Sequence, residues 1–226
     1  MAADFAGKVE PPKCSESTGK KIAVVGGGPG GLSSAYYLQL MGHQVVVFEM
    51  LPKLGGMLRY GIPNYRLPKD RLDEDIQAIL DTGVQVRYGV CVGTDITIDE
   101  LRQQYDAVLI MIGASMDKKL GLDDEDADGV VSAVEFLRNA GKGENVDLKG
   151  QEVCVIGGGN VSMDAVRTAV RMGAKKVSIV YRRRTADMTA LPDEIEGAIS
   201  EGVEIHTLKA PNKIELNGAG HVEGIW

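Results

Sequence analysis

Two glycine-rich turns, about 130 residues apart, constrain this chain more than any other feature of its sequence. The first lies at residues 26–31 and the second at residues 157–162. A short apolar run precedes each turn and an amphipathic segment follows it. This order is typical of the strand, turn and helix that begin a dinucleotide-binding βαβ unit. The sequence therefore predicts an α/β fold that contains two Rossmann-like dinucleotide-binding domains.

The first turn has the complete Gly-x-Gly-x-x-Gly spacing. Gly26 permits the tight turn, Gly28 lets a pyrophosphate approach the backbone, and Gly31 allows close packing of helix on strand. Glu49 ends the next apolar run, 21 residues after Gly28, where a carboxylate accepts hydrogen bonds from ribose hydroxyls. Because this carboxylate would repel a 2′-phosphate, the site should prefer FAD or NAD to NADP. The alternative is a glycine-rich turn that binds no ligand.

The second turn departs from the pattern at its third position, where Ser162 replaces glycine. Serine is small enough to keep helix and strand close, so the turn still fits the fingerprint. The strand that follows leads to Arg182, Arg183 and Arg184 instead of an acid. Guanidinium groups at this place can fork onto a 2′-phosphate, which favours NADP(H), although a basic run can also be a solvated surface turn. The contrast between the two turns assigns FAD to the first site and NADPH to the second.

The remaining pattern predicts the organisation of the chain. We expect a flexible arm over residues 1–20, the N-terminal part of an FAD-binding domain over 21–131, and an inserted, incomplete NADPH-binding domain over 132–226. Because the sequence stops inside a predicted strand, we expect it to be a fragment of a longer protein. The expected strands are 21–25, 44–48, 84–88, 106–112, 203–208 and 221–226; the expected helices are 30–41, 69–82 and 192–201; a second βαβ unit runs from 152 to 181.

Composition excludes several functional classes. The net charge of −7 argues against a nucleic-acid-binding surface, which needs a dominant basic face. No apolar run reaches the ~18 residues of a membrane span, and residues 1–20 lack the apolar core of a signal peptide, so we expect a cytoplasmic protein. The three cysteines, Cys14, Cys91 and Cys154, form no Cys-x-x-Cys pair. A zinc site, a disulfide scaffold and a thiol relay are therefore not predicted.

Several segments together resemble the small (beta) subunit of NADPH-dependent glutamate synthase. They are the two turns, Phe48-Glu49, the run Leu54-Gly55-Gly56-Met57-Leu58-Arg59-Tyr60-Gly61-Ile62-Pro63, and Tyr181-Arg182-Arg183. The same module resembles parts of dihydropyrimidine dehydrogenase. The resemblance covers residues 20–226, and the run that begins at Leu54 is its most specific part.

The resemblance implies an FAD domain interrupted by an NADPH domain, a flavin-contacting loop in the 53–68 segment, and a turn at Gly113 and Ala114 where the chain leaves the FAD domain. It also implies a C-terminal segment that completes the FAD domain, which we expect to be missing after Trp226. Relatives carry N-terminal cysteines for iron–sulfur clusters, whereas only Cys14 is present here. The candidate cofactor-binding residues are Gly26, Gly28, Pro29, Gly30, Gly31, Glu49, Met50, Gly55, Gly56, Leu58, Arg59, Ile62, Gly113, Ala114, Gly157, Gly159, Asn160, Val161, Asp164, Arg182 and Arg183.

We therefore expect a flavoprotein module that passes a hydride from NADPH to FAD and electrons onward to an iron–sulfur or glutamate synthase large-subunit-like partner. No catalytic side chain and no metal ligand is assigned, because the cofactors supply the chemistry. Glu194 and Glu196 could approach the nicotinamide but are better explained as solvated residues at a helix start. Two alternatives stay open: a nucleotide-binding piece of a larger assembly without catalysis, and an NAD-linked dehydrogenase. Association with further copies of the chain is also left open.

Overall fold

The structure is a computed structural model that describes residues 12–114, 116, 118–143 and 147–226. The chain divides into two compact units. The first comprises the described residues up to Arg59 together with Asn64–Ala114, and the second comprises Tyr60–Pro63 and the described residues after Ala114. Each unit contains one of the glycine-rich turns.

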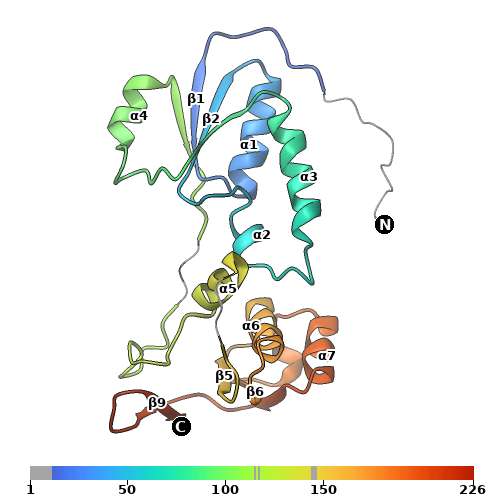
Figure 1. The fold of residues 1–226 in the computed structure, drawn as a ribbon, viewed down its shortest axis with the longest axis vertical. Coiled ribbons are helices and arrows are strands. Elements are labelled where there is room, and N and C mark those ends of the chain that lie inside the picture. The colour runs from blue at the N-terminus through green and yellow to red at the C-terminus, as the bar shows by residue number, and fades with distance from the viewer. Residues whose placement is uncertain (1–11, 115, 117, 144–146) are drawn as a thin grey trace. The chain divides into compact units, whose positions relative to one another are not determined.

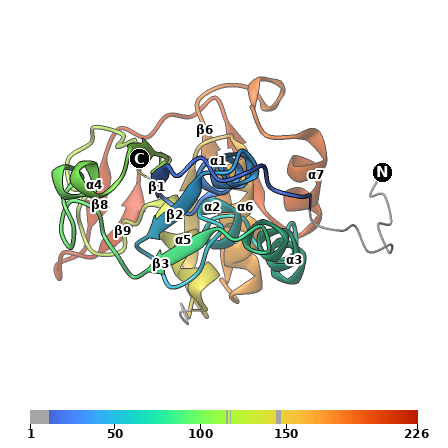
Figure 2. The same ribbon diagram turned by 90° about the horizontal axis from the view of Figure 1, so that it is seen from above.

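The first unit is a four-stranded parallel sheet with the order β3-β2-β1-β4, covered by helices on both faces (Figures 1 and 2). This order is the beginning of a Rossmann sheet. Its elements are β1 (Lys21–Val25), α1 (Pro29–Leu40), β2 (Gln44–Glu49), α2 (Met57–Tyr60), α3 (Lys69–Leu80), β3 (Gln85–Tyr88), α4 (Ile98–Gln104) and β4 (Ala107–Ile110).

Alternate residues of β1 enter different cores. Ile22 and Val24 pack with side chains of α1 and α3 on one face of the sheet. Ala23 and Val25 pack on the other face with Leu101 of α4. Because successive side chains of a strand point to opposite faces, an unbroken apolar run fits a strand that is covered on both sides. β1 is thus the central, doubly buried strand from which the first turn emerges.

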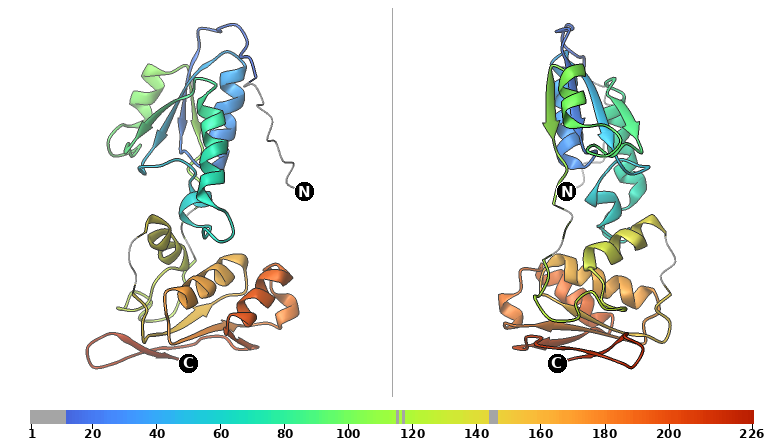
Figure 3. Two further views of the ribbon diagram at one scale, coloured as in Figure 1. Left: turned by 45° about the vertical axis from the view of Figure 1, so that its right-hand side comes forward. Right: turned by 90° about the vertical axis from the view of Figure 1, so that its left-hand side faces the viewer.

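The second unit has a three-stranded parallel sheet with the order β5-β6-β7 and a separate antiparallel pair, β8-β9. α6 and α7 lie over one face of the parallel sheet (Figure 3). The elements are α5 (Ala133–Lys142), β5 (Glu152–Ile156), α6 (Asn160–Arg171), β6 (Lys176–Tyr181), the 3-10 turn η1 (Thr185–Asp187), α7 (Pro192–Ser200), β7 (Glu204–Thr207), β8 (Ile214–Leu216) and β9 (Val222–Ile225).

The prediction of two Rossmann-like units is confirmed, and the expected strands and helices agree with the structure to within two residues at most of their ends. Helices α4 and α5 were not predicted, although each begins with a capping signal. The side-chain oxygens of Thr97 and Ser132 accept hydrogen bonds from the backbone N–H groups of Glu100 and Glu135. A Ser or Thr followed three residues later by Glu is a capping signal that can be recognised in the sequence alone.

Residues 1–11 of the expected flexible arm lie outside the described residues. The rest of the arm is bound to the first unit: the backbone N–H of Ser15 donates to the Leu40 carbonyl at 2.8 Å, and that of Thr18 donates to the Gly42 carbonyl at 3.0 Å. Lys20 pairs with Asp106 at 2.8 Å. None of the helices in the described ranges combines the length and the apolar character that a membrane-spanning segment needs.

Replacing Gly31 by alanine should destabilise the first unit. A Cβ on Gly31 would lie 1.9 Å from the Gly26 carbonyl oxygen, so α1 would have to move away from β1. We expect a loss of about 3 kcal/mol in the free energy of unfolding, measured by urea denaturation. Gly30→Ala is the matched control, because its Cβ would meet only Met111 Sδ at 3.5 Å, an ordinary contact. Equal stabilities of the two variants would contradict the packing argument.

Candidate dinucleotide-binding sites

The first turn can exist only because two of its residues lack side chains. Gly26 has φ +106°, and a Cβ on it would lie 2.4 Å from the Met111 carbonyl oxygen. A Cβ on Gly31 would collide with the carbonyl oxygen of Gly26 itself. The turn therefore brings the start of α1 against the end of β1, as the fingerprint predicts.

The start of α1 offers free donors to an anion. The N–H groups of Gly30 and Gly31 are not hydrogen-bonded to any residue that the structure describes. In front of them, a Cβ on Gly28 would have Gly56 Cα at 3.8 Å as its nearest neighbour, so the position is open. Backbone donors at the positive end of a helix, with room for approach, suit a pyrophosphate.

Glu49 lies at the end of β2 and is 5% exposed. Its Oε2 accepts the N–H of Gly27 at 2.8 Å, and its Oε1 accepts the N–H of Leu51 at 2.8 Å. These bonds fix the carboxylate beside the turn. Each oxygen keeps further acceptor capacity, because an ionised carboxylate has about four lone-pair sites. Glu49 therefore presents a fixed carboxylate beside the turn whose oxygens can accept further hydrogen bonds.

The loop that follows β2 is bound directly to the first turn. The N–H of Gly55 donates to the Gly27 carbonyl at 2.8 Å. Gly56 has φ +52°, and a Cβ on it would lie 2.7 Å from Gly28 Cα. The Leu54 side chain packs on Gly27 and is buried. Two glycine motifs that are separate in the sequence thus form one surface.

The Arg59 side chain has one partner in this loop and one in α3. Its side chain is buried, and its guanidinium donates to the Leu54 carbonyl and pairs with Asp73. Lys69 donates to the Leu58 carbonyl at 2.8 Å. Burial, together with the neighbouring Arg59 charge, lowers the pKa of Lys69. The two cations hold the loop in shape, so within this structure Arg59 supports the loop that covers the turn.

In the second turn a serine, Ser162, packs where the helix meets the strand. Gly157 has φ +142°, and a Cβ on it would lie 2.6 Å from Ser162 Oγ. The Ser162 hydroxyl therefore occupies the space that the missing side chain of Gly157 leaves, and Ser162 is buried. The exchange of glycine for serine at the third position is compatible with close packing of α6 on β5.

A loop also covers the second turn. The N–H groups of Thr189 and Ala190 donate to the Gly158 carbonyl at 3.0 and 3.1 Å. Asn160 Oδ1 accepts the N–H of Leu191 at 3.0 Å. Asn160 thus orients the covering loop, whereas Gly159 remains open, with Thr189 Oγ1 3.5 Å from its Cβ position. The carbonyl of the middle glycine binds a loop in both units.

The three consecutive arginines after β6 have different environments. Arg184 forks onto Asp187, with both N–O distances at 3.0 Å. This pairing lowers the pKa of Asp187. Arg182 and Arg183 are exposed, and neither side chain forms an ion pair or hydrogen bond with a residue in the described ranges. Two of the three guanidinium groups are therefore available to a phosphate.

The other candidate residues are dispersed. Pro29 is the first residue of α1, and Met50 is exposed beside Glu49. Val161 is half-exposed and Asp164 is buried, both in α6. Ile62 belongs to the second unit, whereas Ala114 is the last residue of the first. Gly113, with φ +71°, has no neighbour within 4 Å of its Cβ position.

Glu194 is not a solvated residue, and this expectation was wrong. Its side chain is 16% exposed and pairs with Arg167 of α6. Arg167 also binds Glu201 at 2.9 Å and lies over Gly197, whose Cβ position is 3.2 Å from the Arg167 Cζ atom. Although burial alone would raise the pKa of Glu201, Arg171 and Arg167 outweigh it and lower that pKa. This cluster joins α6 to α7.

Glu194→Gln should lower the free energy of unfolding by about 1–3 kcal/mol, because the Arg167 guanidinium loses a charged partner in a half-buried place. Urea denaturation measures the change. Glu196→Gln on the exposed side of α7 is the control and should lie within about 0.5 kcal/mol of the parent protein. A Glu194 variant of unchanged stability but altered nucleotide binding would instead place Glu194 in the ligand site.

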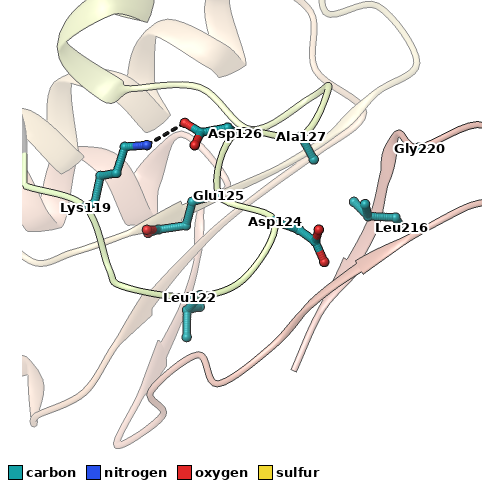
Figure 4. A pocket seen from close by; sticks show the side chains of 8 residues that line it. All are labelled: Lys119, Leu122, Asp124, Glu125, Asp126, Ala127, Leu216 and Gly220. Carbon is teal, nitrogen blue, oxygen red and sulfur yellow. Dashed lines mark hydrogen bonds and ion pairs between the residues drawn. The ribbon is translucent and has the colours of Figure 1, made fainter.

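A separate pocket of about 570 Å³ lies between the 119–127 loop and the β8–β9 pair (Figure 4). It contains no residue of either glycine turn. Its acidic side chains are Asp124, Glu125 and Asp126, and its one lysine, Lys119, is paired with Asp126 (Figure 4). An acidic lining repels phosphate groups, so this pocket is not a dinucleotide site.

Comparison with known proteins places these features in a family. The family described as "Pyridine nucleotide-disulphide oxidoreductase" matches residues 20–224. The chain is 43% identical over 211 residues to the NADP(+)-dependent formate dehydrogenase subunit beta of Moorella thermoacetica, a match that covers 92% of this chain and 30% of that protein. It is 39% identical over 220 residues to the glutamate synthase [NADPH] small chain of Escherichia coli, with 93% and 47% covered. The chain thus spans less than half the length of these relatives.

Solved structures agree in fold. Mycobacterium tuberculosis FprA in complex with NADPH superimposes with a TM-score of 0.77 at 20% identity, covering 90% of this chain and 66% of that one. Lactococcus lactis thioredoxin reductase gives a TM-score of 0.68 at 19% identity, with 91% and 70% covered. Together with the family match over residues 20–224, the two glycine turns and their parallel sheets identify the chain as a member of the pyridine nucleotide-disulphide oxidoreductase family.

Proposed function

We propose that this chain is the nucleotide-binding module of an NADPH-dependent flavoprotein, with FAD in the first site and NADPH in the second. The observation that carries the proposal is the contrast between Glu49, a fixed carboxylate beside the first turn, and Arg182 and Arg183, unpaired guanidinium groups that follow β6 in the second unit. A carboxylate suits a ribose with free hydroxyls, whereas guanidinium groups suit a 2′-phosphate.

The residues of the first unit fit FAD. The open position at Gly28 and the free N–H groups of Gly30 and Gly31 would receive the pyrophosphate, and Glu49 would accept a ribose hydroxyl. Gly55 and Gly56, which lie on the turn, would form the wall beside the pyrophosphate. We keep Met50, Leu58, Arg59, Ile62, Gly113 and Ala114 as proposed members of this site.

The residues of the second unit fit NADPH. Gly157, Gly159, Asn160 and Val161 would bind the pyrophosphate at the start of α6, and Asp164 lies one turn further into that helix. Arg182 and Arg183 would bind the 2′-phosphate. When both nucleotides are bound, the chemistry available is hydride transfer from the nicotinamide to the flavin ring.

The electrons would leave to an iron–sulfur protein or to a glutamate synthase large-subunit-like partner. Two relatives carry the names of one subunit of a larger enzyme: a formate dehydrogenase subunit beta and a glutamate synthase small chain. Another is named NADPH-Fe(3+) oxidoreductase subunit beta, from Geobacter sulfurreducens. The three cysteines are distant from one another in the sequence and do not form the Cys-x-x-Cys pair of a dithiol relay. A dithiol exit is therefore not part of the proposal.

Addition of NADPH to the purified protein, supplied with FAD and kept free of oxygen, should bleach the visible absorption of the oxidised flavin. Absorption spectroscopy measures the change. Binding of both nucleotides without bleaching would favour the alternative of a non-catalytic nucleotide-binding piece, and failure to bind either would reject the proposal.

Gly28→Ala provides a control for this experiment. Its backbone, with φ −78° and ψ −177°, is accessible to alanine, and the added Cβ meets no close neighbour, so the fold should be unchanged. The methyl group would project into the space proposed for the pyrophosphate. We expect FAD binding to be lost while NADPH binding persists.

Arg182→Ala should raise the dissociation constant for NADPH by about 10- to 100-fold and that for NADH by less than about threefold, because only NADPH carries the 2′-phosphate. Isothermal titration calorimetry with each nucleotide measures both values. Lys175→Ala is the control: it removes one positive charge directly before β6, where Lys175 pairs with Glu152, and should change both values by less than about threefold. Equal weakening of NADPH and NADH by Arg182→Ala would contradict the assignment of the second site.

A further inference from the structure

The two units can be compared residue by residue through their strand pairing. In the first unit Val25 pairs with Phe48, and the next residue of β2 is Glu49. In the second unit Ile156 pairs with Val180, and the next residue of β6 is Tyr181. The hydrogen bonds agree with this register: Gly26 N donates to the Phe48 carbonyl at 2.8 Å, and Gly157 N donates to the Val180 carbonyl at 3.1 Å. Tyr181 therefore stands in the position of Glu49.

The side chains at these two positions contact the same glycine of their turns. In the first unit Glu49 Oε2 lies 2.8 Å from the Cβ position of Gly27 and accepts the N–H of that residue. In the second unit the Cδ2 and Cε2 atoms of Tyr181 lie 2.8 Å from the Cβ position of Gly158. An aromatic ring thus fills the place in which the first unit holds a carboxylate.

Tyr181 also forms a hydrogen bond with the segment that follows the arginines. Its hydroxyl donates to the Asp187 carbonyl at 2.8 Å, which ties η1 to the end of β6. Arg184 donates two side-chain hydrogen bonds to the Asp187 carboxylate, and the nearby Arg183 charge also lowers the pKa of Asp187. Asp187 is the nearest acid in the sequence to Arg182 and Arg183, and this arrangement keeps its charge neutralised.

We propose that Tyr181 is a specificity-determining residue of the second site. Its ring occupies the position in which a carboxylate would bind the ribose hydroxyls. Its hydroxyl binds the Asp187 carbonyl and so keeps the Asp187 carboxylate paired with Arg184. This inference rests on the proposed binding of a nicotinamide dinucleotide there, and it adds a residue to the proposed arginines. The arginines attract the 2′-phosphate, whereas Tyr181 removes the group that would repel it. Discrimination between NADPH and NADH therefore depends both on attraction of the 2′-phosphate and on the absence of a group that repels it.

A purely structural role for Tyr181 makes a different prediction. If the ring only filled space beside Gly158, any smaller side chain would weaken the binding of both nucleotides to the same extent. A specificity role requires that charge at this position matters more than size. Glutamate and glutamine at position 181 separate the two effects, because they have nearly the same shape and differ in charge.

The test is calorimetric titration of Tyr181→Glu, Tyr181→Gln and Tyr181→Phe with NADPH and with NADH. We expect NADPH to bind the Glu variant about 10- to 100-fold more weakly than the Gln variant, with NADH changed by less than about threefold between the two. Tyr181→Phe keeps the ring but removes the hydrogen bond to the Asp187 carbonyl, so we expect its preference for NADPH to fall between that of the parent protein and that of the Glu variant. If the Glu variant does not fold, the shorter pair Tyr181→Asp and Tyr181→Asn provides the same comparison.

Equal NADPH affinity of the Glu and Gln variants, or a parallel loss of both nucleotides, would overturn the role of Tyr181. That result is distinguishable from a failure of the proposed function, in which the unmodified protein would bind neither nucleotide. A parent protein that prefers NADPH, together with a Tyr181→Glu variant of unchanged preference, would leave the arginines as the source of discrimination and remove Tyr181 from it.

Discussion

The contact between helix and strand at each glycine turn is the constraint on which the rest of this structure depends. In the first unit the Gly26 carbonyl occupies the volume that a side chain on Gly31 would need. In the second unit the Ser162 hydroxyl occupies the volume that a side chain on Gly157 would need. In both cases the absence of one Cβ lets the helix start beside the end of its strand. Because the first N–H groups of a helix have no partner within it, this geometry presents them beside the end of the strand.

The second element common to both units is a loop bound to the carbonyl of the middle glycine. The loop after β2 binds Gly27 in the first unit, and the loop before α7 binds Gly158 in the second. The supports differ, since Arg59 and Lys69 hold the first loop, whereas the Arg167 cluster holds the helix that follows the second. In each unit, charged side chains that are partly or fully buried therefore bind the loop or the helix next to it.

Discrimination between the two proposed ligands depends on the residue at the end of the second strand in each unit. Glu49 is held by two backbone N–H groups and cannot swing away from the turn without losing both. Tyr181 occupies the equivalent position, and the arginines follow it by one and two residues. The exchange of Glu49 for Tyr181 at this register position thus accompanies a change from a negative local charge in the first unit to a positive one in the second.

The sequence by itself determined the two units, most of their elements and the charge contrast, because glycine spacing and apolar runs are local properties that the fold must obey. It also contained the capping signals of α4 and α5, which are local in the same way. Only the tertiary structure revealed that Glu194 is half-buried and paired with Arg167, that Arg184 alone of the three arginines is paired, and that Tyr181 matches Glu49 in register. These are contacts between residues distant in the chain or comparisons between strands, and neither can be read from spacing along a single sequence.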